Sequence, residues 1–327
     1  MNSSVDFADS FRVHLSQWAV DHGLADCVES GRGQPWVLAR EHRFKNLFRK
    51  EWWGYIQGFE HRWARALNSS QCFAVNLFAT LAEDPSKAHR FLQRILPERR
   101  ITETDEVEVR FEHTPNGMPE RLGESRQPTQ IDVFFEVVRR GRVWGGIGIE
   151  VKLTEGEFGS CRGWNGRREK KHINPERDRC LDVASVLEAP EKQCFIAERE
   201  GRLYWTLMGA GDSSFNVSRL AQETHCPFRH GLYQMMRNRV ALDVYQTVTG
   251  AEWTEFAVCV HPANKRVTLL PQPVAGETDA IEAFRKLLRP GGMQEWDASK
   301  VLDFVSTAGG SAEWASWMAS KYLLFAG

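Results

Sequence analysis

The stretch from residue 130 to residue 153 constrains the fold most, because it holds two short apolar segments joined by a tight turn. Residues 131–138 and 145–153 are rich in β-branched, aromatic and glycine residues, and Arg140-Gly141 separates them. This pattern predicts a β-hairpin. Side chains two apart on a strand share a face, so Glu150 and Lys152 should point together, with Asp132 across the hairpin. We therefore expect two carboxylates and one ammonium group in one place.

Such a trio suits the hydrolysis of a phosphodiester. Carboxylates bind Mg²⁺ or Mn²⁺, and the bound metal lowers the pKa of a water and polarises the phosphoryl group. Lys152 can orient or deprotonate that water and stabilise the developing negative charge. The alternative is an exposed Glu150–Lys152 ion pair on an edge strand, which would contribute little to the stability of the fold. The apolar and glycine-rich surroundings of the pair favour a buried setting instead.

The pattern Asp132…Glu150-Val151-Lys152 resembles the signature of the PD-(D/E)XK nuclease superfamily, an aspartate followed by Glu-X-Lys on a hairpin. The usual proline is displaced, because Pro128 lies four residues before Asp132. By this resemblance Asp132 and Glu150 are metal ligands, the Val151 carbonyl is a further ligand, and Lys152 is the catalytic lysine. Three segments resemble a bacterial restriction-endonuclease-like family: Ser69-Ser70-Gln71, residues 148–152 and Cys226-Pro227-Phe228-Arg229.

The order of elements agrees with this resemblance. We expect an α/β fold with a PD-(D/E)XK core, in which helices flank a mixed central sheet. The expected core elements are a helix over 69–96 broken near Asp84-Pro85, strands over 107–113, 131–138 and 144–153, a helix over 229–247 and a strand over 256–261.

The expected domain organisation is a core with additions at both ends. A helical, basic and aromatic region covers 1–68, the nuclease-like core covers 69–262 with an insertion at about 155–228, and a helical addition covers 263–327. Residues 194–197 and 203–207 are predicted to be extra strands in the insertion. The predicted C-terminal helices cover 280–288, 298–304 and 312–325.

A formal net charge of −1 does not by itself indicate a nucleic-acid-binding protein. Residues 162–179, however, contain seven Lys or Arg against three acidic residues, and they directly follow the proposed site. This basic segment can contact phosphates, although charge runs also form solvated faces. A second basic and aromatic stretch covers 36–65. The candidate nucleic-acid-binding residues in the first segment are Arg162, Arg167, Arg168, Lys170 and Lys171.

The helix expected over 229–247 carries further candidates. In the PD-(D/E)XK superfamily the helix after the hairpin often supplies a Gln, Lys or Arg near the phosphate. By that resemblance Gln234 has a catalytic role and Arg237 binds nucleic acid. Gln234 and Asn238 lie four residues apart and so share a helix face, which in the alternative reading simply faces water.

The cysteines leave two interpretations open. Cys161, Cys180 and Cys226 can gather around a structural zinc ion, or around an iron–sulfur cluster of the kind that some members of the superfamily carry. Their spacing matches no CxxC signature, so buried cysteines acting as small hydrophobic residues are the alternative. Core positions are expected for the other cysteines with apolar neighbours, Cys72, Cys194 and Cys259.

Together these patterns predict a Mg²⁺- or Mn²⁺-dependent endonuclease that cleaves nucleic acid, with DNA preferred, in restriction-like defence or DNA processing. The alternatives are a catalytically inactive nucleic-acid-binding module of the same fold and an interaction protein stabilised by a cysteine-bound metal. The chain lacks 18 consecutive apolar residues, and its first residues lack the basic start and apolar core of a signal peptide. We therefore expect a cytoplasmic protein without membrane contact. The oligomeric state stays open, a homodimer included.

Overall fold

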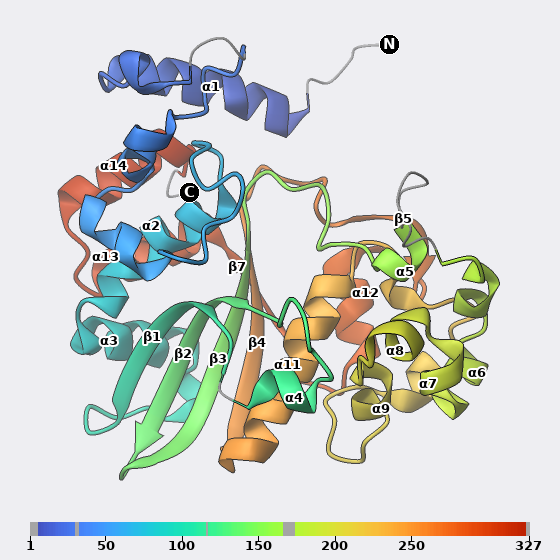
Figure 1. Cartoon of the computed structure of the whole chain (residues 1–327). Helices are drawn as coiled ribbons and strands as arrows, with labels where there is room; N and C mark the ends of the chain where they lie inside the picture. The colour runs from blue at the N-terminus through green and yellow to red at the C-terminus, as the bar shows by residue number, and fades with distance from the viewer. Residues whose placement is uncertain (1–5, 30–32, 116, 166–173, 325–327) are drawn as a thin grey trace.

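A computed structural model describes residues 6–29, 33–115, 117–165 and 174–324. Its centre is a five-stranded mixed sheet in the order β1-β2-β3-β4-β7 (Figure 1). The first three strands pair antiparallel, and β3, β4 and β7 pair parallel. Helices flank both faces, so the architecture is mixed α/β and compatible with a restriction-endonuclease-like fold. The strands are β1 (Glu106–His113), β2 (Ile131–Arg139), β3 (Arg142–Lys152), β4 (Trp253–Val260) and β7 (Gln294–Asp297).

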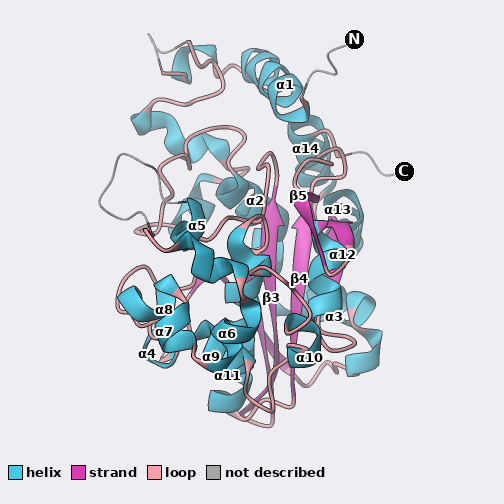
Figure 2. Ribbon diagram, turned by 90° about the vertical axis from the view of Figure 1, so that its right-hand side faces the viewer, coloured by secondary structure: helices cyan, strands magenta, loops and turns pink. Residues whose placement is uncertain are grey.

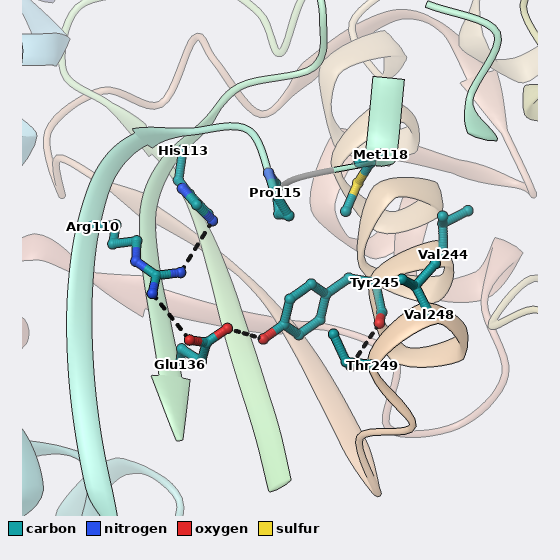
Figure 3. Close-up of a pocket in the computed structure, with 9 residues that line it drawn as sticks. All are labelled: Arg110, His113, Pro115, Met118, Glu136, Val244, Tyr245, Val248 and Thr249. Atoms are coloured by element: carbon teal, nitrogen blue, oxygen red, sulfur yellow. Dashed lines mark hydrogen bonds and ion pairs between the residues drawn. The ribbon is translucent and has the colours of Figure 1, made fainter. Parts of the chain in front are cut away.

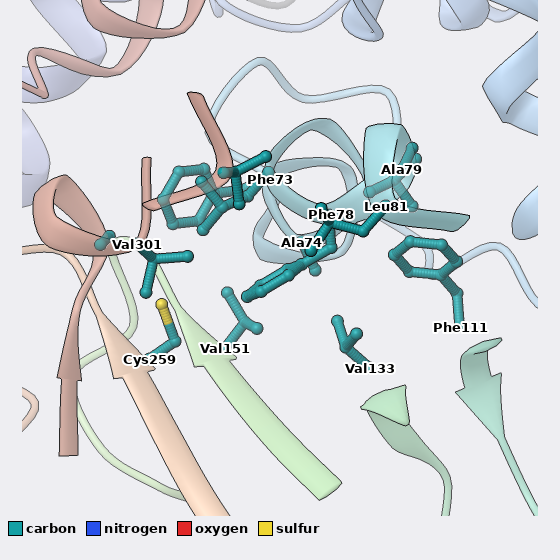
Figure 4. Packing of buried hydrophobic residues seen from close by; sticks show 14 of the residues in the cluster. Phe73, Ala74, Phe78, Ala79, Leu81, Phe111, Val133, Val151, Cys259 and Val301 are labelled. Carbon is teal, nitrogen blue, oxygen red and sulfur yellow. The ribbon is translucent and has the colours of Figure 1, made fainter. Parts of the chain in front are cut away.

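One face of the sheet packs against helices α2 (Ser70–Ala82), α3 (Pro85–Ile95) and α13 (Ala298–Thr307). The Ser69 hydroxyl accepts a hydrogen bond from the Cys72 amide and so caps α2. Asp84 caps α3 in the same way, directly before a proline at the first helical position. Figure 4 shows Phe73 and Phe78 of α2 above the inward side chains of the strands.

The other face packs against α11 (Tyr233–Thr249), which approaches β3 closely. A Cβ atom on Gly148 would lie 3.0 Å from Leu242 Cδ1, and one on Gly146 would lie 3.3 Å from Tyr245 Cε1. Larger residues at these two positions would push the helix away from the sheet. Glycine at these two alternate positions of β3 therefore allows α11 to pack close to the strand. Helix α12 (Ala280–Leu287) covers the same face beside it (Figure 1).

The segment between β3 and α11 is helical and lies beside α11 in both views (Figures 1 and 2). The strands predicted over 194–197 and 203–207 are wrong, because these residues begin two short helices. The buried side chains of the second are Tyr204, Trp205 and Met208, a helical spacing that buries one face. The elements are α5 (Arg162–Asn165), η5 (Arg177–Leu181), α6 (Val183–Glu188), α7 (Pro190–Gln193), α8 (Phe195–Glu200), α9 (Tyr204–Met208), α10 (Val217–Leu220) and η6 (Pro227–Arg229).

The two ends of the chain pack together. Helix α1 (Phe7–Asp21) lies beside α14 (Ala312–Tyr322), and Trp18 Nε1 donates to Ser320 Oγ over 3.2 Å (Figure 2). Short helical turns then lead from α1 to α2: η1 (Ala25–Cys27), η2 (Arg40–Asn46) and η3 (Lys50–Tyr55). The remaining elements are η4 (Pro97–Arg99), α4 (Met118–Arg121), β5 (Leu269–Val274) and β6 (Glu277–Asp279).

The core elements expected from the sequence are confirmed, including the break near Asp84-Pro85 and the three C-terminal helices. Two features were not expected. The C-terminal stretch supplies β7 to the central sheet, and β5 pairs with β6 as a separate hairpin. Within the described ranges, none of the helices combines the length and the apolar character needed to cross a membrane.

Candidate active site

The β2–β3 pairing brings Asp132 opposite Glu150. Val133 pairs with Ile149 in the antiparallel ladder, so the next facing pair is Asp132 and Glu150. The backbone N–H of Val151 donates to Asp132 Oδ2 over 2.8 Å, which fixes the aspartate at the end of the hairpin. The period of two along each strand thus places both carboxylates on the face that α11 covers.

Lys152 and Glu150 form a buried pair that α11 completes. Lys152 Nζ lies 2.6 Å from Glu150 Oε1 and donates to Gln234 Oε1 over 3.0 Å. Asn238 Nδ2 donates to the other oxygen of Glu150 over 2.6 Å. Gly148, Glu150 and Lys152 lie on the same face of β3, because side chains two apart on a strand share a face. α11 packs on this face at Gly148, so its first turns lie over Glu150 and Lys152. Gln234 and Asn238 therefore touch the two charged residues singled out in the sequence.

A third carboxylate comes from β1. Phe111 pairs with Val133, so Glu112 lies next to the Asp132 position on the neighbouring strand. Glu112 is buried and has a φ of 46°, a left-handed conformation that is strained for a residue other than glycine. Gln71 Nε2 donates to Glu112 Oε1 over 2.7 Å, and His61 Nε2 lies 3.6 Å from its Oε2. Gln71 and His61, from two other segments, thus contact the carboxylate of this strained residue.

The charges of this cluster are unbalanced. Burial, together with the charges of Glu150 and Glu112, raises the pKa of Asp132 well above its usual value. Burial lowers the pKa of Lys152, but the carboxylates, first of all Glu150, outweigh it and raise the pKa overall. Lys152 is therefore held as an ammonium ion. With three carboxylates around one lysine, the site favours a further cation.

A cavity of about 330 Å³ opens onto the cluster. Asp132, Glu112, Gln234 and Asn238 line it, while Glu150 and Lys152 are only 1% and 5% exposed. Arg237, another residue singled out in the sequence, also lines the cavity, and its Nε donates to Thr129 Oγ1 over 3.2 Å.

Two further depressions share His61 with this cavity. One measures about 520 Å³ and contains Trp36 and Trp63, and the other measures about 630 Å³. The second is lined by four arginines and three glutamates of the N-terminal region: Arg40, Arg43, Arg62, Arg65, Glu29, Glu41 and Glu60. The carboxylate cavity therefore adjoins a surface of mixed charge that carries arginine, glutamate and tryptophan side chains.

The basic segment predicted over 162–179 lies only partly in the described residues. Arg162 is exposed, and its Nε donates to Glu200 Oε1 over 2.6 Å. Arg179 is paired with Glu198, at 2.9 Å. Outside the described residues lie four of the predicted nucleic-acid-binding residues: Arg167, Arg168, Lys170 and Lys171.

The structure brings together the three cysteines singled out in the sequence. Cys161, Cys180 and Cys226 line one small cavity, and Cys194, which we expected in the core, lines it too. Cys72 and Cys259 are buried in the core, as expected, and Figure 4 shows Cys259 there. Among the described residues, no three His, Cys, Asp or Glu side chains are arranged to hold a single metal ion.

Sequence reasoning missed two polar residues of the cluster. His61 lies in a loop and carries no motif. Gln71 belongs to the Ser69-Ser70-Gln71 phrase, but only the structure reveals its contact with Glu112, 41 positions away. Its place in the first turn of a capped helix was the one available signal.

A separate cavity of about 400 Å³ lies farther along α11 (Figure 3). In it Arg110 Nη2 lies 3.1 Å from Glu136 Oε1, and the Tyr245 hydroxyl donates to the other oxygen of Glu136. Arg110 also lies 3.5 Å from His113. Because every charged group drawn in this cavity has a partner, we regard the network as a structural link between α11 and the sheet.

Comparisons with known proteins identify one family. Residues 12–323 match the model of the REase-ARP family, described as restriction endonuclease associating with ARP. No curated protein and no solved structure matches the chain. The family match covers nearly the whole chain, including the hairpin, α11 and all four cysteines of the small cavity. The chain therefore belongs to the REase-ARP family of restriction-endonuclease-like proteins.

Proposed function

We propose that this protein is a metal-dependent PD-(D/E)XK endonuclease that hydrolyses phosphodiester bonds of DNA, in restriction-like defence or DNA processing. The single observation that carries the proposal is the cluster of Asp132, Glu150 and Lys152 beside a cavity. Gln234 and Asn238 of α11 complete this cluster. Membership in a restriction-endonuclease-like family supports a nuclease role.

The donor atoms fit Mg²⁺ or Mn²⁺. The Asp132 and Glu150 carboxylates and the Val151 carbonyl are hard oxygen ligands, and Glu150 Oε1 is buried without an aligned hydrogen-bond donor, although Lys152 lies close as an ion partner. Mg²⁺ is usually held by one or two carboxylates, with waters and substrate phosphate oxygens as the other ligands. A pair of carboxylates therefore suffices. When bound, the metal would lower the pKa of a water and polarise the phosphoryl group.

The protein's own residues have distinct roles in this proposal. Lys152, held charged by Glu150 and Gln234, stabilises the negative charge that develops on the phosphoryl oxygens. Its raised pKa suits an electrostatic role better than that of a general base. Asn238 fixes the orientation of Glu150 by donating to its second oxygen.

The N-terminal region offers a path for the nucleic acid. The depressions that share His61 with the carboxylate cavity contain five arginines and three tryptophans, which suit phosphate contacts and base stacking, beside four glutamates. We infer that the phosphodiester backbone runs from this surface into the cavity. The basic segment over 162–179 remains a predicted second contact.

Nicking of a supercoiled plasmid in Mg²⁺ and in Mn²⁺ tests the proposal. Lys152→Ala should slow nicking by roughly 10²–10³ while most DNA affinity remains, because one electrostatic stabiliser of the transition state is lost. Asp132→Asn, which keeps the side-chain shape, should also abolish nicking and weaken metal binding. Lys300→Ala, an exposed lysine on α13, is the matched control and should nick at the wild-type rate.

The rival proposal is a binding module of the same fold without turnover. It would be favoured if the wild-type protein binds DNA or RNA but fails to cut either in both metals, with Lys152→Ala binding equally well. Thermal melting of each variant separates loss of chemistry from loss of folding, since Lys152 is buried.

A further inference from the structure

Four of the seven cysteines surround one cavity in the helical insertion. Cys161, Cys180, Cys194 and Cys226 come from four separate segments and all line the same space of about 30 Å³, which has almost no polar lining. All seven cysteines lie in the described residues and are free thiols. Single buried cysteines commonly act as small hydrophobic residues, but this does not explain why four of them meet.

Backbone contacts hold the cysteine-bearing segments together. The Cys226 N–H donates to the Cys180 carbonyl over 2.7 Å, and the Cys161 N–H donates to the Arg229 carbonyl over 3.3 Å. A Cβ atom on Gly163 would lie 3.5 Å from Cys161 Sγ and 3.4 Å from the Phe195 ring, next to Cys194. The convergence is therefore built into the backbone and does not depend on side-chain rotamers alone.

The surroundings of the sulfur atoms suit thiolates that a metal has deprotonated. Each of Cys161, Cys194 and Cys226 directly precedes a helical turn. The backbone amides of Gly163 and Trp164 hydrogen-bond to the Cys161 sulfur. The amides of Ile196 and Ala197 contact the Cys194 sulfur, and the amide of Phe228 contacts the Cys226 sulfur. Amide hydrogen bonds to sulfur stabilise metal-bound thiolates, and metal coordination removes the thiol proton outright.

We propose that Cys161, Cys180, Cys194 and Cys226 are the four ligands of a [4Fe–4S] cluster, whose insertion would widen the cavity of about 30 Å³ that they line. A single zinc ion needs four ligand atoms that converge on one point, with Zn–S distances of about 2.3 Å. The described side chains form no such group, whereas four sulfurs spread around a cavity match the Cys₄ ligation of a cluster. Arg229 lies near enough to Cys226 and Cys180 to offset part of the cluster's negative charge.

The cluster would also fix the beginning of α11. Tyr233 and Met236 on one side of this helix line the cysteine cavity, while Gln234 and Asn238 on another side line the carboxylate cavity. The Gln234 N–H donates to the Phe158 carbonyl over 2.9 Å, three residues before the first cysteine. The proposed role is structural, and the metal content can be measured whether or not the protein cuts DNA.

Metal analysis of the full-length chain, purified without oxygen, tests the proposal. Iron, acid-labile sulfide and zinc are measured per chain, together with visible absorbance before and after dithionite. We expect about four iron and about four sulfide per chain, and a broad absorbance that dithionite bleaches. Cys194→Ser and Cys226→Ser should each lose most of the iron. Cys27→Ser, which alters a buried cysteine outside the cavity, is the matched control and should keep it.

The wild-type protein decides the question even if the cysteine variants fold poorly. One zinc per chain without sulfide would overturn the cluster in favour of a single-ion thiolate site. Absence of both zinc and iron, even after reconstitution with ferrous iron and sulfide, would overturn metal binding by these cysteines altogether. Retention of full iron content by both Cys194→Ser and Cys226→Ser would show that other residues hold it.

Discussion

At the residue scale, three side-chain amides hold the charged groups of the candidate active site. Asn238 donates to Glu150, Gln234 accepts from Lys152 and, on the opposite side, Gln71 donates to Glu112. An amide satisfies a buried charge without adding another, so the excess of carboxylates over lysine is preserved. A divalent cation would relieve the repulsion between carboxylates that raises the pKa of Asp132.

Replacement of Asn238 tests this arrangement. Asn238→Leu keeps a similar side-chain volume but leaves Glu150 Oε2 without its hydrogen-bond donor. Glu150 is only 1% exposed, so water does not readily replace the donor. We expect a loss of about 1–3 kcal/mol in the free energy of unfolding, the usual cost of one unsatisfied buried group, together with slower plasmid nicking. Urea denaturation measures the first effect. Unchanged stability in Asn238→Leu would show that water or another side chain replaces the amide.

The residues of this cluster differ in how far the sequence predicts them. Asp132, Glu150 and Lys152 were predictable, because strand alternation fixes which side chains share a face. His61 and Gln71 were not predictable, because their contacts with Glu112 join segments far apart in the chain. Local sequence patterns do not indicate such contacts.

At the element scale, α11 serves two sites and one structural network. Its first turns reach the carboxylate and cysteine cavities, and its later turns pack on Gly148 and Gly146 of β3. Tyr245 lies seven residues after Asn238, two turns along the helix, and donates to Glu136 of β2 (Figure 3). We infer that this far contact anchors the helix on the sheet.

Tyr245→Phe tests the anchor. Loss of the hydroxyl should lower the free energy of unfolding by roughly 1–2 kcal/mol, because a hydrogen bond to a charged, partly exposed carboxylate disappears while Arg110 still pairs with it. In a double-mutant cycle with Glu136→Gln, the two effects should not add. Nicking by Tyr245→Phe should stay near the wild-type rate, since the change lies two turns from the cluster. A large loss of nicking at unchanged stability would contradict this purely structural role.

The sequence predicts the elements of the sheet better than those of the insertion. In β1 to β4, apolar residues match strands that are buried in the sheet, so local pattern and tertiary setting agree. Residues 194–197 and 203–207 have the same short apolar runs, yet they form α8 and α9. Short apolar runs suit either a buried strand or one buried helical face, and only the packing against neighbouring segments decides between them.

At the whole-molecule scale, a buried lysine joins the two ends of the chain. Lys321 Nζ of α14 donates to the carbonyl oxygen and to Oδ1 of Asn46, both over 2.6 Å. Rings from both ends surround it, with Trp18 and Trp317 within 5.4 Å and 4.7 Å. Asn76 of α2 donates to the same Asn46 carbonyl over 3.0 Å, so the contact extends to the core.

This contact makes stability depend on pH in a defined window. Burial lowers the pKa of Lys321 from 10.5 to about 7, so between these values the unfolded chain binds one more proton than the folded chain. The contribution of Lys321 to the free energy of unfolding should therefore rise as pH increases from about 7 to about 10, by up to a few kcal/mol. The titratable neighbours Cys72 and Tyr322 act in the opposite direction at the upper end of this window. Burial raises the pKa of Cys72 to about 12 and that of Tyr322 well above its usual value, so the unfolded chain loses these protons before the folded chain does.

Lys321→Met isolates this effect, because methionine fills a similar space and does not titrate. Urea denaturation at pH 7, 8, 9 and 10 should show the wild-type protein gaining stability relative to Lys321→Met as pH rises, since only the wild-type unfolded state binds the extra proton and the other titratable groups are present in both proteins. The exposed Lys300→Met is the matched control and should keep the wild-type slope. Parallel curves for wild type and Lys321→Met would mean that Lys321 has an ordinary pKa in the folded protein. The buried lysine would then be charged at neutral pH, and Asn46 with the surrounding rings would have to compensate for its burial.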